Sequence, residues 1–412
     1  MIKQIRESKY FLMTACLFLA FLGHGMGGMI ISQNRVALEG QWGNLYYFGS
    51  VMSMVGWGRL LTFFIAGKLS DSLGRKFFIA LGTGVYIVGL IGMSFSDTLF
   101  FASSMAFLFG AANSFLDVGT YPALVEAFPA MGKKMNTALV INIRIAQLIL
   151  PIVMLSVFSA TGLGMNFRIS FFAIAAIFVL NFILVMASKF PDHKAALAEQ
   201  KAQIEADKAK NPETKAGVSA LFTIEGMAFI VYGFISMGTF MIIQQFSNRF
   251  GAAVLGMDPD IANFIPTFFA VGSIIGVLIT IFSLNKFKAV DVMVALTATS
   301  LAATLIVRFA PSVPTLIIGT ALIGFAAAGG VMQMGITLMI EIMPLGKGVV
   351  SGTFLSMGSI ASIVVPQVVA SIEANNHLNV MLFNAGLAAV GLLCAIIINV
   401  RFKAIEKAKA SQ

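Results

Sequence analysis

A few ionisable side chains lie inside long apolar segments, and they are the residues of this sequence best placed to do chemistry. An ionisable group inside a membrane-spanning helix costs about 2.5–3.5 kcal/mol on insertion scales, so such groups are rare and are functional candidates. A carboxylate beside an arginine can exchange a proton as its surroundings change, and an arginine can hold a carboxylate or hydroxyl group of a solute. The candidates of this kind are His24, Arg59, Asp117, Glu126, Arg144 and Glu341.

Three polar residues share one face of a predicted helix. Asn113, Asp117 and Tyr121 repeat every four residues, which places them on one side of an α-helix. At 1.5 Å of rise per residue, Asn113 lies near the middle of its apolar segment and Asp117 lies one turn further along. Arg144 and Arg59 fall at similar depths in their own segments, so we predict that Asp117 pairs with one of them. The alternative is a buried ion pair that only holds helices together.

His24 lies in the middle of the first apolar segment, between Gly23 and Gly25. Glycines on either side allow another helix to approach closely. A histidine titrates near neutral pH and can carry a coupling proton. We therefore predict a role for His24 in coupling or binding, with a neutral histidine hydrogen-bonded inside the helix bundle as the alternative.

The second half of the chain offers amides where the first half offers charges. Its candidates are Gln244, Gln245 and Gln333, and Gln333 falls one residue from the position that repeats Asp117. Uncharged donors and acceptors suit hydroxyl groups or a carboxylate. Charges in one half and amides in the other predict a small, polar or anionic solute, although each amide alone could serve only helix packing.

The composition indicates which elements must position these residues. Of 412 residues, 58% are hydrophobic and only 11% are charged, with a mean hydropathy of +0.92. Soluble domains carry about 25% charged residues, and about 20 apolar residues suffice to span a bilayer. We expect an all-α membrane protein of twelve transmembrane helices, near residues 10–34, 45–66, 77–95, 98–128, 134–160, 167–188, 219–247, 261–283, 289–308, 314–341, 348–371 and 378–401.

The net charge of +9 follows the predicted topology. Most Lys and Arg fall in the N-terminus, in alternate loops, in a Lys-rich central stretch and in the C-terminus, as the positive-inside rule requires. We therefore expect a multi-pass protein of a bacterial inner membrane with both termini in the cytoplasm, and no nucleic-acid partner. The predicted domains are a six-helix half over 1–188, a cytoplasmic linker over 189–218 and a second six-helix half over 219–412.

The two halves are related by an internal repeat. The stretch from Glu126 to Pro129 recurs as the stretch from Glu341 to Pro344, an offset of 215, and Pro151 recurs as Pro366 at the same offset. Six helices repeated once around a central loop is an arrangement of secondary transporters whose halves rock about a site at the membrane midplane.

One loop motif carries a resemblance to a known family. Gly67, Asp71, Gly74, Arg75 and Lys76 are spaced as in the signature loop of the major facilitator superfamily, although Ser72 replaces a usual basic residue. The glycines allow a tight turn, and the basic residues hold the loop on the cytoplasmic side. The resemblance implies that this loop, together with Glu341, acts as a conformational latch.

Finer resemblances bear on the solute and on Glu126. Four stretches, His24 to Asn34, Gly56 to Leu60, Asn113 to Pro129 and Gly324 to Pro344, span both halves of the chain. They are similar to bacterial permeases of the YdiN and YdiM type, a group associated with shikimate or quinate metabolism. The stretch from Val125 to Phe128, with Arg144 following, resembles lactose permease, where the corresponding acid and arginine bind sugar. Since Glu126 repeats as Glu341 near the ends of two helices, a charge contact with the cytoplasmic loops is the other interpretation of Glu126.

These observations predict a monomeric secondary active transporter that works by alternating access. We expect proton-coupled uptake of a hydroxylated carboxylic acid of the shikimate or quinate type, or of a sugar, with proton-driven export of amphipathic drugs or metabolites as the alternative. An enzyme is not expected, because His24, His193 and His377 are scattered and no phosphate-binding glycine loop is present. We expect no metal and no cofactor.

Overall fold

The computed structural model describes most of the chain as helices. The described residues are 5–44, 47–154, 167–192, 221–284, 286–326, 332–342 and 347–410. The chain divides into two compact units, Met1–Lys210 and Asn211–Gln412.

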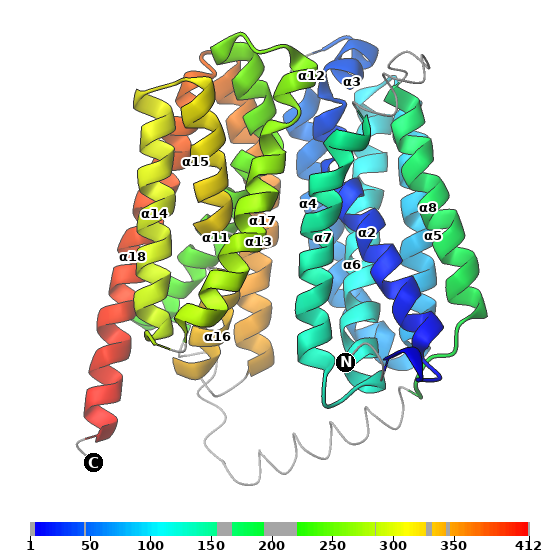
Figure 1. The fold of residues 1–412 in the computed structure, drawn as a ribbon, viewed down its shortest axis with the longest axis horizontal. Helices are drawn as coiled ribbons and strands as arrows, with labels where there is room; N and C mark the ends of the chain where they lie inside the picture. The colour runs from blue at the N-terminus through cyan, green and yellow to red at the C-terminus, as the bar shows by residue number, and fades with distance from the viewer. Residues whose placement is uncertain are drawn as a thin grey trace. The chain divides into compact units, whose positions relative to one another are not determined.

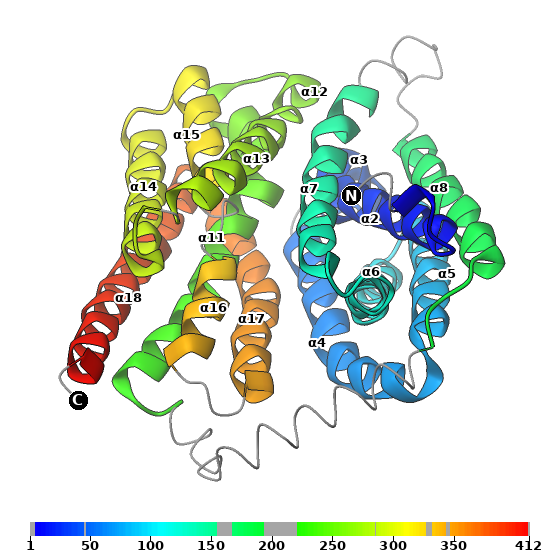
Figure 2. The same cartoon turned by 60° about the horizontal axis from the view of Figure 1, so that its bottom comes forward.

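The first unit is a bundle of long helices with one short helix (Figure 1). α6 begins after Thr98, whose hydroxyl accepts a hydrogen bond from the Phe101 backbone N–H and so satisfies one free donor of the first turn. Seen nearly end-on, α6 lies among its neighbours, and it contacts α2, α4, α5 and α7 (Figure 2). Residues on α6 are therefore central to this unit. Its helices are α2 Phe11–Gln33, α3 Arg35–Trp42, α4 Tyr47–Leu73, α5 Arg75–Ser94, α6 Leu99–Ala127, α7 Gly132–Val153 and α8 Phe167–Ala187.

The second unit also combines long helices with shorter ones. α11 is capped by the Thr223 hydroxyl and ends at Gly256, which adopts the left-handed conformation with φ 65°. Its helices are α11 Ile224–Leu255, α12 Pro259–Ala262, α13 Ile265–Ser283, α14 Ala289–Phe309, α15 Val313–Ala326, α16 Met332–Ile342, α17 Lys347–Glu373 and α18 Leu378–Ala410.

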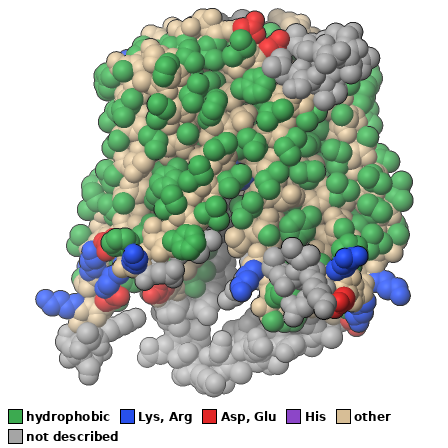
Figure 3. All heavy atoms as spheres, viewed as in Figure 1, with side chains coloured by type: hydrophobic (Ala, Val, Ile, Leu, Met, Phe, Trp, Pro, Cys, Tyr) green, Lys and Arg blue, Asp and Glu red, His purple; other side chains and the backbone are tan. Residues whose placement is uncertain are grey.

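The described helices include 11 segments long and apolar enough to cross a membrane. The remaining predicted span, 314–341, corresponds to the shorter apolar helix α15 and to α16, and residues 327–331 between them lie outside the described part of the chain. In each unit, hydrophobic side chains cover the visible sides of the helices, and Lys and Arg gather at one end (Figure 3). This distribution fits helices whose sides face lipid.

Several helix ends differ from the sequence prediction. α4 was expected to end near residue 66 but continues to Leu73, so Gly67 and Asp71 lie in its last turns and not in a tight turn. Only Gly74 makes the turn, with a φ of 93° that favours glycine. α18 was expected to end near 401 and continues to Ala410. Charged residues can extend a helix beyond the bilayer, whereas hydropathy marks only the apolar part.

Matched glycines bring the same helix pair together in both units. A side chain at Gly58 would collide with the Phe107 carbonyl, and one at Gly110 would collide with the Val55 carbonyl, so α4 and α6 touch backbone to backbone. Gly272 and Gly324, each 214 positions after its counterpart, bring α13 and α15 together in the same way. The internal repeat thus extends to the helix packing.

Candidate functional site

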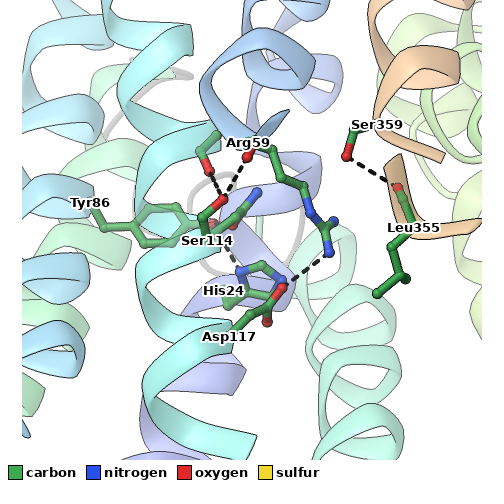
Figure 4. Close-up of polar contacts among 9 residues, drawn as sticks. His24, Arg59, Tyr86, Ser114, Asp117, Leu355 and Ser359 are labelled. Carbon is green, nitrogen blue, oxygen red and sulfur yellow. Dashed lines mark hydrogen bonds and ion pairs between the residues drawn. The ribbon is translucent and has the colours of Figure 1, made fainter. Parts of the chain in front are cut away.

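The predicted ion pair of Asp117 is present, and its partner is Arg59. The Nη2 atom of Arg59 donates to Oδ2 of Asp117 at 3.1 Å, between α4 and α6 (Figure 4). The Arg59 side chain is 33% exposed, whereas that of Asp117 is 11% exposed. The Arg59 side chain is therefore the more accessible of the two, and the Asp117 carboxylate is largely shielded.

The backbone around this pair is held by short helix-to-helix contacts. The Ser114 hydroxyl on α6 donates to the Arg59 carbonyl on α4 at 3.0 Å. Gly58 and Gly110 flank this contact and allow the two backbones to touch. Arg59 and Asp117 consequently face each other from a rigid helix pair.

Arg144 lies on α7 and is not the partner of Asp117. Its Nη1 atom donates to Oε1 of Gln147, one turn along the same helix, at 2.8 Å. The guanidinium of Arg144 is thus oriented by an amide of its own helix.

His24 bonds to a residue that the sequence prediction missed, Tyr86. The Nδ1 atom of His24 lies 3.0 Å from the Tyr86 hydroxyl oxygen, and the Tyr86 hydroxyl in turn donates to Oδ1 of Asn113. As expected, the glycines beside His24 allow close approach, because Gly25 abuts the Ile143 carbonyl of α7. A single tyrosine in an apolar helix gives no spacing signal, so only the fold reveals the chain that links His24, Tyr86 and Asn113.

The motif that spans the end of α4 and the start of α5 is centred on Arg75, which is 7% exposed. Its Nη1 atom donates to Oδ1 of Asp71 and to the Ser70 hydroxyl, both at 2.8 Å, and its Nε donates to Oε1 of Glu126 at 2.9 Å. Because Arg carries its donors in a fixed fork, one side chain can tie the end of α4 to the end of α6.

Glu126 therefore contacts the motif. Its carboxylate pairs with Arg75 at the end of α6 and is 9% exposed. Of the two interpretations from sequence, the contact with the loop is the one that this geometry favours. Assigning Glu126 to the solute-binding group requires that it leave Arg75.

Lys76 has a separate role from its neighbour. Its Nζ donates to the backbone carbonyls of Met186 and Ser188, at 2.8 and 3.0 Å. These carbonyls lie at the C-terminal end of α8, where backbone acceptors lack helical partners and favour a positive charge. Lys76 thus fastens the start of α5 to the end of α8.

In the second unit, basic residues at the start of α14 and in α18 form exposed pairs with acidic residues. Lys288 donates to Glu406 of α18 at 2.6 Å, and this contact raises the pKa of the Lys288 ammonium above its ordinary value. Lys403 of α18 donates to Asp291 at 2.6 Å. These exposed pairs connect α18 to the start of α14.

The predicted amides of the second unit are only partly accounted for. Gln244 and Gln245 are buried on α11, with 4% and 5% of their surface exposed. Gln333 lies in the first turn of α16, and its side chain is outside the described residues. Glu341 is exposed one residue before the end of α16.

Within the described ranges, no group of three or more His, Cys, Asp or Glu side chains could hold a metal ion. The two cysteines, Cys16 and Cys394, are free and buried.

Comparison with known proteins identifies the family. The family model of the Major Facilitator Superfamily matches residues 13–366. The chain belongs to the Major Facilitator Superfamily. It is 33% identical to the inner membrane transport protein YdiM of Escherichia coli (strain K12) over 398 residues, which cover 96% of this chain and 95% of that protein. It is 29% identical to the MFS-type transporter YfkL of Bacillus subtilis (strain 168), covering 96% and 97%, and 25% identical to YdiN of E. coli (strain K12), covering 96% and 91%.

Solved structures of this superfamily share the fold. A D-xylose-proton symporter matches with a TM-score of 0.73 and 14% identity, covering 95% of this chain and 97% of that one. The E. coli fucose:proton symporter FucP matches with a TM-score of 0.61 and 19% identity, covering 95% and 99%. The predicted major facilitator fold and the resemblance to YdiM and YdiN are confirmed. The chain is a multi-pass membrane transporter and not an enzyme.

Proposed function

We propose that this protein is a secondary active transporter that couples proton movement to uptake of a small polar solute. The Arg59–Asp117 pair is the observation that carries the proposal. Ionisable groups inside a transmembrane bundle are energetically costly and usually have a function. Asp117 takes up a proton when Arg59 turns to the solute, and releases it when the pair re-forms. The proton-coupled sugar symporters of similar fold make this chemistry reasonable for the superfamily.

The proposed solute is a hydroxylated carboxylic acid of the shikimate or quinate type, or a sugar. Arg144 and Arg59 would hold a carboxylate or paired hydroxyls, since guanidinium groups bind planar oxyanions with two donors. His24 and Tyr121 offer neutral hydrogen-bonding groups beside them, and the buried amides Gln244 and Gln245, with Gln333, are proposed for the second unit.

The proposal also includes the membrane topology of the chain and the residues of a conformational latch. The Lys-rich stretch 189–218 joins two six-helix halves on the cytoplasmic side, with both termini there and the protein in a bacterial inner membrane as a monomer. The Arg75 fork, with Gly67, Asp71, Gly74, Lys76, Glu126 and Glu341, is the proposed latch. Cysteine labelling from either side would test the topology, because the two native cysteines are buried and give little background. A periplasmic linker would contradict it.

A ligand screen tests the solute class. A ligand that binds the folded protein raises its stability by an amount that grows with ligand concentration relative to Kd, so purified protein should be stabilised by hydroxylated acids or sugars, and Arg144→Gln should abolish the shift. Arg401→Gln is a matched control, because Arg401 pairs with Glu225 in the other unit and is 47% exposed. Stabilisation by cationic amphipathic dyes, with no effect of Arg144→Gln, would favour the alternative, drug export.

A further inference from the structure

The hydrogen bonds that link His24, Tyr86 and Asn113 determine which imidazole nitrogen of His24 carries the ring hydrogen. A tyrosine hydroxyl carries one hydrogen and can donate it once. In this structure the hydroxyl of Tyr86 donates to the amide oxygen of Asn113, which can only accept. The contact between Tyr86 and His24 must therefore be donated from the histidine side.

This direction decides the tautomer of the imidazole. The Nδ1 atom of His24 lies 3.0 Å from the Tyr86 oxygen and must carry the ring hydrogen in order to donate. In the neutral ring only one nitrogen is protonated. The other nitrogen, Nε2, then presents a lone pair and acts as a hydrogen-bond acceptor.

Packing around Tyr86 holds this arrangement in place. The Tyr86 ring is fully buried and stacks on Phe178 with the ring centres 4.6 Å apart and the planes 9° apart. Phe109 meets the ring edge-on at 5.6 Å. Gly27 makes room for the ring, since a Cβ at that position would lie 3.0 Å from the Tyr86 Cε1 atom. The hydroxyl is thus held in position by its ring.

The groups drawn with His24 suggest what Nε2 receives. The His24 side chain is partly buried, and Figure 4 draws it with Arg59 and Asp117, which pair with each other at 3.1 Å. Within this unit, α5 contributes Tyr86, which bonds to Nδ1, and Phe21 of α2 lies against both His24 and Tyr121 of α6. An acceptor in the same group as a guanidinium suits a molecule that carries a hydroxyl and a carboxylate together.

We infer that Tyr86 and Asn113 are positioning residues that keep the proton of His24 on Nδ1, so that Nε2 accepts a hydrogen bond from a hydroxyl group of the transported solute. The role of Nε2 towards a solute rests on the proposed function. The position of the proton does not, since it is a property of the protein without solute. Asn113, a candidate binding residue, acts here through Tyr86.

Nitrogen NMR of ¹⁵N-histidine-labelled protein in lipid nanodiscs, without solute and at mildly alkaline pH, tests the proton position. The chain has only three histidines, so the resonances that vanish in His24→Asn belong to His24. We expect the Nδ1 resonance of His24 to be of the protonated type and the Nε2 resonance to be of the unprotonated type. The reverse pattern in the unaltered protein would overturn the inference.

Two variants and a control test the cause. Asn113→Leu frees the Tyr86 hydroxyl to donate to Nδ1, so the proton should move to Nε2. Tyr86→Phe keeps the stacked ring but removes the acceptor, and should give a mixture of both tautomers. Tyr232→Phe removes a buried tyrosine hydroxyl that bonds to Thr297 in the second unit at 2.7 Å, and should leave the His24 resonances unchanged. An unshifted spectrum in Asn113→Leu would contradict the proposed roles of Tyr86 and Asn113, whatever the protein transports.

Discussion

Arg59 of α4 and Asp117 of α6 form an ion pair whose nitrogen and oxygen lie 3.1 Å apart, and the arginine side chain is the more exposed of the two, at 33% against 11%. The carboxylate is therefore the more shielded partner. That asymmetry makes the pair suitable for exchange of partners, since a solute anion can replace Asp117 on the guanidinium.

Breaking the pair on one side should destabilise the protein more than removing both charges. A buried charge left alone costs about 3–5 kcal/mol, and the exposure of Arg59 reduces this to about 1–2 kcal/mol. We expect Asp117→Asn to unfold at a lower temperature than the double variant Asp117→Asn with Arg59→Gln, measured by thermal unfolding in detergent. Asp291→Asn removes an exposed paired acid and should have little effect. Equal losses in the single and double variants would mean that the Arg59 charge left without Asp117 carries no cost.

The pairing of Asp117 could be predicted from sequence because depth along a helix follows from residue count. The choice between Arg59 and Arg144 could not, since it depends on helix rotation and on the glycines that bring α4 and α6 together. Tyr86 was missed for the same reason. Its importance comes from lying opposite His24 and Asn113 after folding.

The sequence prediction fails at two helices. The glycines of the motif predict a tight turn at Gly67, yet α4 continues past it to Leu73. The helix α3 was not predicted, because its charges resemble those of a loop. In the fold Arg35 and Glu39 form a buried pair at 2.7 Å, one turn apart on the helix. Hydropathy alone cannot show that two charges neutralise each other.

The contact between α4 and α6 should tolerate no side chain at Gly58. Gly58→Ala places a methyl group against the Phe107 carbonyl, and such overpacking costs about 1–3 kcal/mol. Gly84→Ala is the matched control, because Gly84 lies in α5 with nothing within 4 Å and alanine favours helix by up to about 1 kcal/mol. Thermal unfolding should show a loss for Gly58→Ala alone. A loss of the same size at Gly84 would show that the helix contact is not responsible.

The fork of Arg75 should not be replaceable by lysine. Arg75→Lys keeps the charge but cannot reach Asp71, Ser70 and Glu126 together, so we expect a loss of about 1–3 kcal/mol in stability and slower transport. Arg401→Lys makes the same change at an exposed pair and should alter stability by less than about 1 kcal/mol. Full stability of Arg75→Lys would mean that charge alone holds the motif.

Replacing His24 by glutamine or by asparagine should distinguish the role of Nε2 from that of Nδ1. Glutamine places a polar atom near the position of Nε2, whereas asparagine reaches only near Nδ1. If Nε2 meets the solute, His24→Gln should keep more uptake than His24→Asn, by roughly 10-fold in kcat/KM for the loss of one hydrogen bond. Initial uptake rates at matched protein levels would measure this. Greater uptake by His24→Asn would reverse the assignment.

The central claim, that Asp117 carries the coupling proton, is tested most directly in liposomes that contain Asp117→Asn. Two transport modes are compared for a solute identified by the ligand screen: accumulation driven by a pH gradient, and exchange of labelled for unlabelled solute without a gradient. We expect Asp117→Asn to lose gradient-driven accumulation but to keep exchange, while Asp291→Asn keeps both. Undiminished accumulation against a gradient in Asp117→Asn would contradict it.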